Sequence, residues 1–240
     1  MSTVGFRRYP RPRADVSGPV RTLSAFKSTD LADGLQRSGT MSGIAPVYQP
    51  VRPVCGPAIT VSVPAGGFSM TKLALEQCQP GDILVVAAKG NTTHALWGGN
   101  LSLGAQRRGL LAVIVDGAIR DVGEIRALDF PVFAAGIATS ADPISVPFGE
   151  VNVPVACGRI VVCPGDVIVA DGDGIVCVRP DDAAAVAAAT TRVIEGHQKV
   201  MPLLERGDVT GFADIERSMR EAGLTDEPHP WPGTESTRSE

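Results

Sequence analysis

The 240-residue sequence predicts a mixed α/β domain built of packed layers. Aliphatic strand patterns alternate with helical patterns between residues 54 and 139, the order expected of parallel strands joined by crossover helices. Strand patterns then follow one another directly over residues 144–178, as they do in hairpins. A long helical pattern over residues 181–206 comes after them. The expected fold class is therefore an α/β domain with a mixed sheet and a long C-terminal helix.

The first predicted elements are a helix, a strand and a second helix. The first helix covers residues 28–38, with Ser28 or Thr29 as its cap, because hydroxyl side chains accept hydrogen bonds from the first free amides of a helix. The strand covers residues 54–63, where apolar residues alternate, and the second helix covers residues 69–78.

Two buried strands form the centre of the predicted sheet. Residues 83–89 and 110–117 are almost continuously aliphatic, as in strands that are covered on both faces. The other elements predicted in this region are a loop feeding a helix at 95–109, a turn and short helix at 118–128, and a strand at 130–139.

Glycine and proline mark the turns that follow. Pro-Gly-Asp occurs twice, at residues 80–82 and 164–166, and an aliphatic strand follows each time. Asp-Gly-Asp-Gly at residues 171–174 predicts a hairpin. We expect Pro202 to kink or interrupt the C-terminal helix, because proline lacks the N–H of a helical hydrogen bond. A further short helix is expected at 212–223.

The chain is expected to divide into an arm, one folded domain and a tail. Residues 1–20 are rich in Arg and Pro and show no periodicity, which predicts a flexible arm, and residues 226–240 form a polar tail. Residues 21–225 then make a single α/β domain, long enough to bury a core without disulfides. No apolar run approaches the roughly 20 residues of a membrane span, so we expect no membrane partner.

Composition and charge limit the class of partner. The net charge is −4 and the isoelectric point is about 5.4, whereas a general nucleic-acid binder needs a basic surface. We therefore expect no nucleic-acid partner, although one or two arginines can hold a small anion. Three of the five cysteines lie in or beside aliphatic runs, and there is no Cys-x-x-Cys pair. These features favour buried thiols in a reducing compartment, and hence a soluble cytoplasmic protein.

The strongest indication of chemistry lies in residues 97–121. A glycine-rich stretch opens a helix there, and the free amides of a helix N-terminus make an anion site that glycine leaves open to close approach. Arg120 and Asp121 follow a strand, at the sheet edge where ligands bind in α/β proteins. They offer a fork for a carboxylate and a hard oxygen ligand for a divalent cation. A loop salt bridge beside an ordinary glycine turn is the alternative. The glycine-rich stretch consists of Gly98, Gly99, Asn100 and Leu101.

Five segments carry a resemblance to a known family: GPAITV, PGDILVVAA, WGGNL, GLLAVIVDGAIRD and PGDVIVADGDGIVCV. Over roughly residues 22 to 210, the sequence resembles the RraA-like family. That family includes 4-hydroxy-4-methyl-2-oxoglutarate / 4-carboxy-4-hydroxy-2-oxoadipate aldolases and the regulator of ribonuclease E activity. The resemblance implies a swivelling β/β/α fold. It also implies a homotrimer or a dimer of trimers, with sites between subunits.

The resemblance also implies roles for individual residues. Residues 98–101 would bind the pyruvyl carboxylate of a substrate through backbone N–H groups, Arg120 would contact its keto and carboxylate oxygens, and Asp121 would hold Mg²⁺ or Mn²⁺. A neighbouring subunit's C-terminal helix would supply an acidic residue, for which Glu195 is the candidate; a solvated helix face is the alternative. Many family aldolases carry Asp or Glu after the first loop glycine, whereas this sequence has Gly99. The identity of the catalytic base is therefore open.

Several other side chains have both a chemical and a structural interpretation. Lys89 could form a Schiff base if it were desolvated, or it could simply close a strand. His94 could be a substitute base or an ordinary loop histidine. Asp116 could orient Arg120. The aspartates of residues 171–174 have a calcium-like spacing, but the remaining ligands are missing, and a hairpin turn explains them better.

These features together predict a divalent-metal-dependent lyase. Retro-aldol cleavage of a 4-hydroxy-4-substituted 2-oxo dicarboxylic acid would give pyruvate and a second keto acid. The same site could decarboxylate oxaloacetate, because both reactions pass through pyruvate enolate. The substrate would thus be a small anionic 2-oxo acid. The alternative is a non-catalytic module that inhibits a ribonuclease by protein–protein contact. The Arg120-Asp121 pair favours the enzyme, and Gly99 favours the module.

Overall fold

The computed structural model describes residues 4–64, 68–141, 148–209 and 215–227. The chain contains two compact units, Met1–Val193 and Ile194–Glu240. Their boundary falls inside the helix α6 (Ala183–Leu204), whose buried residues Ala183, Val186 and Thr190 all precede it. Residues 21–225 were predicted to form one domain. The sequence does not mark this boundary, because the helical pattern continues beyond the part of the helix that packs against the sheet.

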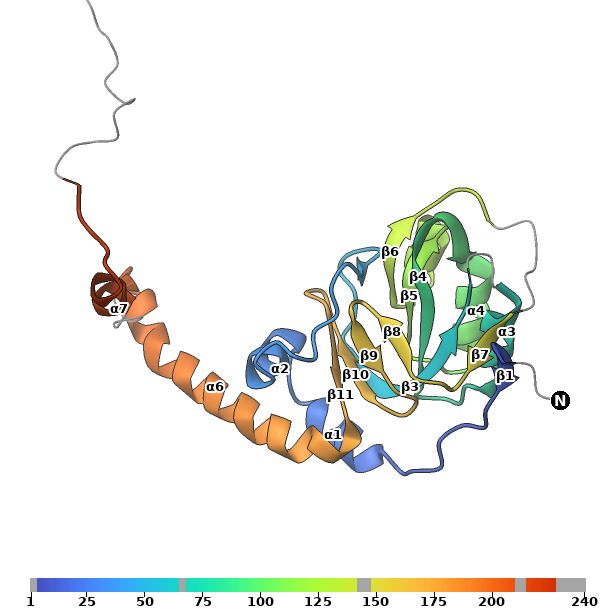
Figure 1. The fold of residues 1–240 in the computed structure, drawn as a ribbon, viewed down its shortest axis with the longest axis horizontal. Coiled ribbons are helices and arrows are strands. Elements are labelled where there is room, and N and C mark those ends of the chain that lie inside the picture. Colours follow the sequence, from blue (N-terminus) through green and yellow to red (C-terminus); the bar gives the residue numbers. More distant parts are fainter. Residues whose placement is uncertain (1–3, 65–67, 142–147, 210–214, 228–240) are drawn as a thin grey trace, which may run out of the picture. The chain divides into compact units, whose positions relative to one another are not determined.

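A mixed sheet forms the centre of the first unit (Figure 1). Its parallel strands are β3 (Val54–Ser62), β4 (Ile83–Trp97), β5 (Ala112–Ile119) and β6 (Val132–Ile137). The helices that join them are α3 (Phe68–Gln77), α4 (Gly99–Arg107) and α5 (Val122–Ala127). At one edge β7 (Gly149–Val151) pairs with β3 and β1 (Phe6–Arg8) pairs with β7, and at the other edge β2 (Ala45–Pro46) pairs with β6. The predicted βαβαβ order is confirmed.

Hairpins and helices form layers on the central sheet. The helix α3 packs on β3 and β4, and the hairpin of β8 (Val155–Cys157) and β9 (Ile160–Val162) contacts the same strands (Figure 1). A second hairpin of β10 (Val167–Ala170) and β11 (Ile175–Val178) extends from β3. The helices α1 (Ser17–Leu23) and α2 (Ser28–Gly34) pack on this hairpin together with the start of α6, which follows the short 3-10 helix η1 (Pro180–Asp182). The second unit also contains α7 (Ile215–Glu221).

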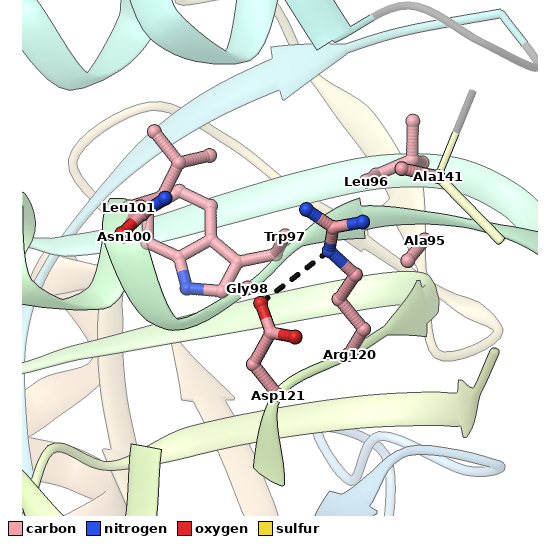
Figure 2. Close-up of a pocket in the computed structure, with 9 residues that line it drawn as sticks. All are labelled: Ala95, Leu96, Trp97, Gly98, Asn100, Leu101, Arg120, Asp121 and Ala141. Atoms are coloured by element: carbon pink, nitrogen blue, oxygen red, sulfur yellow. Dashed lines mark ion pairs between the residues drawn. The ribbon is translucent and has the colours of Figure 1, made fainter. Parts of the chain in front are cut away.

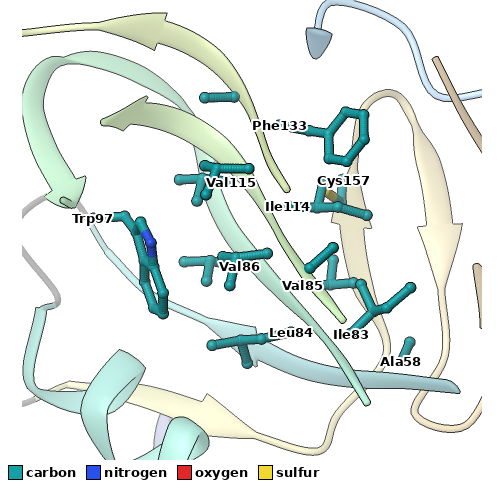
Figure 3. Close-up of a cluster of buried hydrophobic side chains, with 14 of the residues drawn as sticks. Ala58, Ile83, Leu84, Val85, Val86, Trp97, Ile114, Val115, Phe133 and Cys157 are labelled. Carbon is teal, nitrogen blue, oxygen red and sulfur yellow. The ribbon is translucent and has the colours of Figure 1, made fainter. Parts of the chain in front are cut away.

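The core lies between these layers. Fully buried aliphatic side chains of β4 and β5, such as Val85 and Ile114, alternate over both faces of the sheet (Figure 3). This double burial explains why the two strands are almost continuously apolar in the sequence. Cys157 is fully buried in the same cluster, and none of the five cysteines is in a disulfide.

The strand β4 is longer than the sequence predicts. It runs from Ile83 to Trp97, whereas the prediction ended at residue 89 and placed a loop from residue 95. Its pairing with β5 shifts register three times, and Lys89 has a φ of 58°. These bulges accommodate an exposed polar stretch within a strand, which sequence patterns cannot distinguish from a loop. The extension places Trp97 beside Ile119, at the end of β5.

The predicted 171–174 hairpin forms, and it also caps a helix. Asp171 is buried and accepts hydrogen bonds from the backbone N–H of Ser28 at 2.8 Å and from its hydroxyl at 2.6 Å. The predicted cap was Ser28 or Thr29, but α2 begins at Ser28, and its N-cap residue Lys27 makes no side-chain capping bond. The capping acceptor thus comes from a residue distant in sequence. The cap also gives Asp171 a structural role, in agreement with the hairpin interpretation.

The N-terminal residues differ from the predicted arm. Within residues 1–20, β1 pairs with β7 in parallel and α1 begins at Ser17. A strand of three residues shows no periodicity in sequence, so this pairing could not be predicted. Pro202 lies inside α6, which continues to Leu204, so the helix is not interrupted at the proline. In the described residues, no helix is long and apolar enough to cross a membrane.

Candidate functional site

The site begins where β4 ends and α4 starts. Gly98 has an extended conformation and occupies the N-cap position of α4, so the helix starts directly at Gly99. The first amides of a helix have no intrahelical acceptor, which leaves the N–H groups of Asn100 and Leu101 available to a ligand. The predicted glycine-rich helix N-terminus is therefore present.

Arg120 and Asp121 follow the neighbouring strand β5. The backbone N–H of Arg120 donates to the carbonyl oxygen of Trp97 at 3.0 Å, so the ends of β4 and β5 are held together. Asp121 has a φ of 61° and a ψ of 39°, a left-handed conformation that Asp tolerates better than most residues. It precedes α5 and turns its carboxylate back toward the start of α4.

The Asp121 carboxylate joins the two halves of the site (Figure 2). Its Oδ2 accepts the backbone N–H of Gly99 at 3.1 Å and lies 3.4 Å from Nε of Arg120. A Cβ atom on Gly98 would come within 2.6 Å of this same oxygen. Residue 98 must therefore lack a side chain for Asp121 to take this position.

Glu124 occupies the space above the second loop glycine. A Cβ atom on Gly99 would come within 2.0 Å of Glu124 Oε2 and 3.1 Å of its Cβ. Glu124 lies one helical turn after Asp121, so both carboxylates face the start of α4. Glu124 was not among the predicted site residues, although its spacing of three residues from Asp121, and the replacement of an acid by Gly99, were usable signals.

A pocket of about 180 Å³ opens at this place. It is smaller than the roughly 300–1,000 Å³ typical of sites for drug-sized ligands, and it suits a small metabolite. Arg120 supplies the cation among its described lining residues, and its side chain is 44% exposed. The lining residues are Ala95, Leu96, Trp97, Gly98, Asn100, Leu101, Arg120, Asp121 and Ala141 (Figure 2).

The carboxylates can be tested as ligands of a divalent cation. Both contacts of Asp121 end on Oδ2, which leaves Oδ1 as the oxygen that could bind a cation. Among the described residues, no group of three or more His, Cys, Asp or Glu side chains could hold a metal ion. Mg²⁺ is commonly bound by one or two carboxylates, with water and substrate completing its shell. Asp121 therefore offers one oxygen ligand to a hard cation that would share its coordination with a substrate.

Glu195 and the alternative residues lie elsewhere. Glu195 is exposed on the part of α6 that belongs to the second unit, and its role stays a prediction. Lys89 is exposed, so it lacks the desolvation that a Schiff-base lysine needs. His94 is half-buried on β4 and is not among the residues that line the pocket.

Asp116 was a candidate to orient Arg120, but its side chain contacts a different part of the molecule. Its carboxylate accepts a hydrogen bond from the backbone of Gly158, and burial raises its pKa above the ordinary value. Burial raises the pKa of the nearby Cys157 thiol to about 12, and the Asp116 charge contributes to the same shift. Asp116 thus contacts the turn between β8 and β9, and no described hydrogen bond or ion pair joins it to Arg120.

Comparisons with known proteins agree with this geometry. The family described as RraA-like, Aldolase/RraA, matches residues 28–177. A Halalkalibacterium halodurans protein provisionally named 4-hydroxy-4-methyl-2-oxoglutarate aldolase is 38% identical over 139 residues, which are 58% of this chain and 64% of that protein. The alignment therefore spans less than two thirds of that relative. A Methanocaldococcus jannaschii protein described as uncharacterised is 32% identical over 204 residues, which are 84% of this chain and 96% of that protein.

A solved structure has the same fold. It is Streptomyces coelicolor RraAS2, described as an unusual member of the RNase ES inhibitor RraA protein family. The TM-score is 0.69 at 30% sequence identity, and the match covers 80% of this chain and 98% of that one. The predicted fold class is thereby confirmed.

Proposed function

The chain belongs to the RraA-like family, and from this premise we propose that it is a lyase that cleaves a 4-hydroxy-2-oxo acid and releases pyruvate. The observation that carries the proposal is the meeting of Arg120, Asp121 and the N-terminus of α4 around one small pocket. Such a site combines the groups needed to bind a 2-oxo acid and to stabilise its enolate. The name of the Halalkalibacterium halodurans relative supports the same reaction class.

Binding would use the backbone and one arginine. The amides of Asn100 and Leu101 would receive the C1 carboxylate of the substrate at the helix N-terminus. The Arg120 guanidinium would contact the C2 oxygen and the same carboxylate through charge-assisted hydrogen bonds. Asp121 would hold Mg²⁺ or Mn²⁺. A divalent cation bound there would act as a Lewis acid on the 2-oxo group.

Cleavage needs a base and a place for negative charge. A carboxylate takes the proton of the C4 hydroxyl, the C3–C4 bond breaks, and its electron pair forms the enolate of pyruvate while C4 becomes a carbonyl carbon. Arg120 stabilises the enolate oxygen as its charge develops. Protonation of C3 then gives pyruvate. Glu124 is our candidate for the base, because its carboxylate occupies the space where a side chain at residue 99 would lie.

The finer features of the activity also belong to this proposal. The substrate would be a 4-hydroxy-4-substituted 2-oxo dicarboxylic acid. Oxaloacetate would be decarboxylated at the same site, because loss of its C4 carboxylate as CO₂ leaves the same enolate. The active form would be a homotrimer or a dimer of trimers, with Glu195 acting across a subunit boundary.

Pyruvate release tests the lyase directly. We would couple it to lactate dehydrogenase and supply oxaloacetate or 4-hydroxy-4-methyl-2-oxoglutarate with Mg²⁺, with Mn²⁺ and after EDTA. Arg120→Ala should lower kcat about 10²–10³-fold, as expected for loss of one group that stabilises an oxyanion. Asp121→Ala should abolish the response to metal. Arg107→Ala, which removes an exposed arginine at the end of α4, is the matched control and should keep full activity.

A second function is supported by the structural neighbour. The match to Streptomyces coelicolor RraAS2 covers 98% of that chain, and Gly99 in the position of an acid would suit a binding protein. In this case the protein would inhibit a ribonuclease by protein–protein contact. If neither substrate released pyruvate, and Mg²⁺ with oxalate did not raise the melting temperature, the lyase proposal would be overturned and the inhibitor favoured.

A further inference from the structure

A buried hydrogen-bond relay lies beneath the pocket. The indole Nε1–H of Trp97 donates to Oγ of Ser102 at 2.7 Å, and the Ser102 hydroxyl donates to the carbonyl oxygen of Gly98 at 3.0 Å. Ser102 is fully buried and Trp97 is 2% exposed. An indole N–H can only donate, so the serine oxygen must accept from it, and the single hydroxyl proton must go to Gly98. The direction of the relay is fixed by this chemistry.

The relay fixes the peptide plane between the two loop glycines. The backbone N–H of Ser102 also donates to the Gly98 carbonyl at 3.0 Å, so this oxygen is held twice. In a trans peptide, the carbonyl and the following N–H point in opposite directions. Holding the Gly98 carbonyl toward Ser102 therefore aims the Gly99 N–H away from it, toward Asp121 Oδ2 at 3.1 Å.

Trp97 connects the same relay to the arginine. Its backbone carbonyl accepts the N–H of Arg120 at 3.0 Å, and its side chain lines the pocket. Trp97 thus contacts both halves of the site, while Ser102 acts from beneath. Neither side chain supplies a charge or a titratable group, and Ser102 does not line the pocket, so an effect of Ser102 on the reaction must come through orientation.

We propose that Ser102 and Trp97 are positioning residues, which orient the Gly98–Gly99 peptide and through it the Asp121 carboxylate for ligand binding. The inference rests on the proposed function. It goes beyond it by assigning a role in the site to two buried residues that make no charged contact with a substrate. Their loss should weaken binding at the site while the fold survives.

Ser102 can be compared with a helical serine or threonine that has no role in a site. Serine and threonine often donate to the carbonyl four residues earlier without any role in a site. Thr191 on α6 makes such a bond, to the carbonyl of Ala187 at 2.9 Å, and it is exposed. Ser102 differs because its oxygen also accepts from Trp97. Thr191→Ala is therefore the matched control for removal of a hydroxyl that bonds to a helical carbonyl.

Oxalate, a stable analogue of pyruvate enolate, is the probe. The full chain in Mg²⁺ would be titrated with oxalate by calorimetry for every variant. Trp97 fluorescence, in a Trp231→Phe background that removes the other tryptophan, would be a second readout for the variants that keep Trp97. Ser102→Ala and Trp97→Phe should each weaken oxalate binding about tenfold, the loss expected for one buried hydrogen bond. The double variant should be no weaker than either single variant, because both remove the same relay. Ser102→Thr, which keeps the hydroxyl, should restore most of the affinity.

The outcomes separate this inference from the proposed function. A Ser102→Ala protein that keeps its circular dichroism spectrum and binds oxalate as tightly as the wild type would overturn the inference alone. Additive losses in the double variant, or an equal loss in Thr191→Ala, would overturn it as well. If Ser102→Ala does not fold, Trp97→Phe keeps the aromatic ring and decides the same question. A wild-type protein that neither binds oxalate nor releases pyruvate would overturn the proposed function and this inference together.

Discussion

The two Pro-Gly-Asp turns have the same local geometry but different tertiary partners. In each turn, the aspartate Oδ2 accepts the N–H of the residue three positions earlier at 2.7 Å, from Gln79 to Asp82 and from Cys163 to Asp166. The central glycines have φ angles of 92° and 89°, a conformation that favours glycine. Four residues of sequence therefore determine the turn by themselves.

The partners of the two aspartates come from distant parts of the chain. Asp82 is 1% exposed and forms an ion pair with Arg11 from the N-terminal segment. Asp166 is 5% exposed and accepts a weaker hydrogen bond from the Cys177 thiol at 3.6 Å. One buried carboxylate is thus paired with a cation and the other with a neutral group. The comparison shows that identical turns can place a charge in very different environments.

The largest expected effect concerns the thiols beside the two turns. Burial, reinforced by the charge of Asp82, raises the pKa of Cys78 from 9.0 to about 12. Burial and the charge of Asp166 raise the pKa of Cys177 in the same way. A pKa of about 12 leaves about a thousandfold less thiolate than a pKa of 9.0, so both thiols should resist alkylation at pH 8. Iodoacetamide labelling read by mass spectrometry checks this. Fast labelling of either cysteine in the native protein would contradict it, and the chain unfolded in guanidinium is the control.

The next largest effect should follow from loss of the cation at the first turn. Arg11→Ala would leave the buried Asp82 charge without its ion-pair partner and should destabilise the fold by about 2–3 kcal/mol, less than a fully buried pair because Arg11 is partly exposed. Urea unfolding measures the loss. Arg13→Ala, an exposed arginine of the same segment, is the control. Equal stability of the two variants would show that the ion pair contributes nothing.

The smallest effect is expected at the second turn. Asp166→Asn should change stability by no more than about 1 kcal/mol at pH 7, because the amide oxygen can still accept the Cys163 N–H. Burial raises the pKa of Asp166 above its ordinary value of 3.8, so the folded state binds the proton more tightly than the unfolded state. The stability due to this group is present below the unfolded pKa and is lost as the pH rises through the folded pKa. As the pH rises from 3.5 to 7, the urea midpoint of the wild type should therefore fall relative to that of Asp166→Asn. If the difference between the two midpoints stays constant with pH, the predicted effect of burial on the pKa of Asp166 is wrong.

Much of the site could be predicted because it depends on strand order. The carboxyl ends of neighbouring parallel strands meet at one sheet edge, so Gly98 after β4 and Arg120 after β5 had to lie close together. Asp121 was predicted for the same reason. Glu124 was missed although it follows Asp121 by three residues, because its position over Gly99 depends on the packing of α4 on α5.

The contacts that could not be predicted join residues distant in sequence. Asp171 caps α2 across 143 positions, and Arg11 reaches Asp82 across 71. Asp116 was a candidate to orient Arg120, but its carboxylate accepts a hydrogen bond from Gly158 of the distant β8–β9 turn instead. The periodicity of a strand determines which residues share a face, but it does not determine what packs against that face.

The sequence by itself determined the α/β class, the order of strands and helices, the two Pro-Gly-Asp turns, and the meeting of the glycine loop with Arg120 and Asp121. These features follow from hydrophobic periodicity, turn chemistry and the handed connection of parallel strands, all of which act locally. Only the tertiary structure decided the length of β4, the placement of Glu124 over Gly99, the relay through Ser102 and the different partners of Asp82 and Asp166. These depend on which distant groups are packed together, because a buried polar group must find its hydrogen-bond partner wherever the fold brings one within reach.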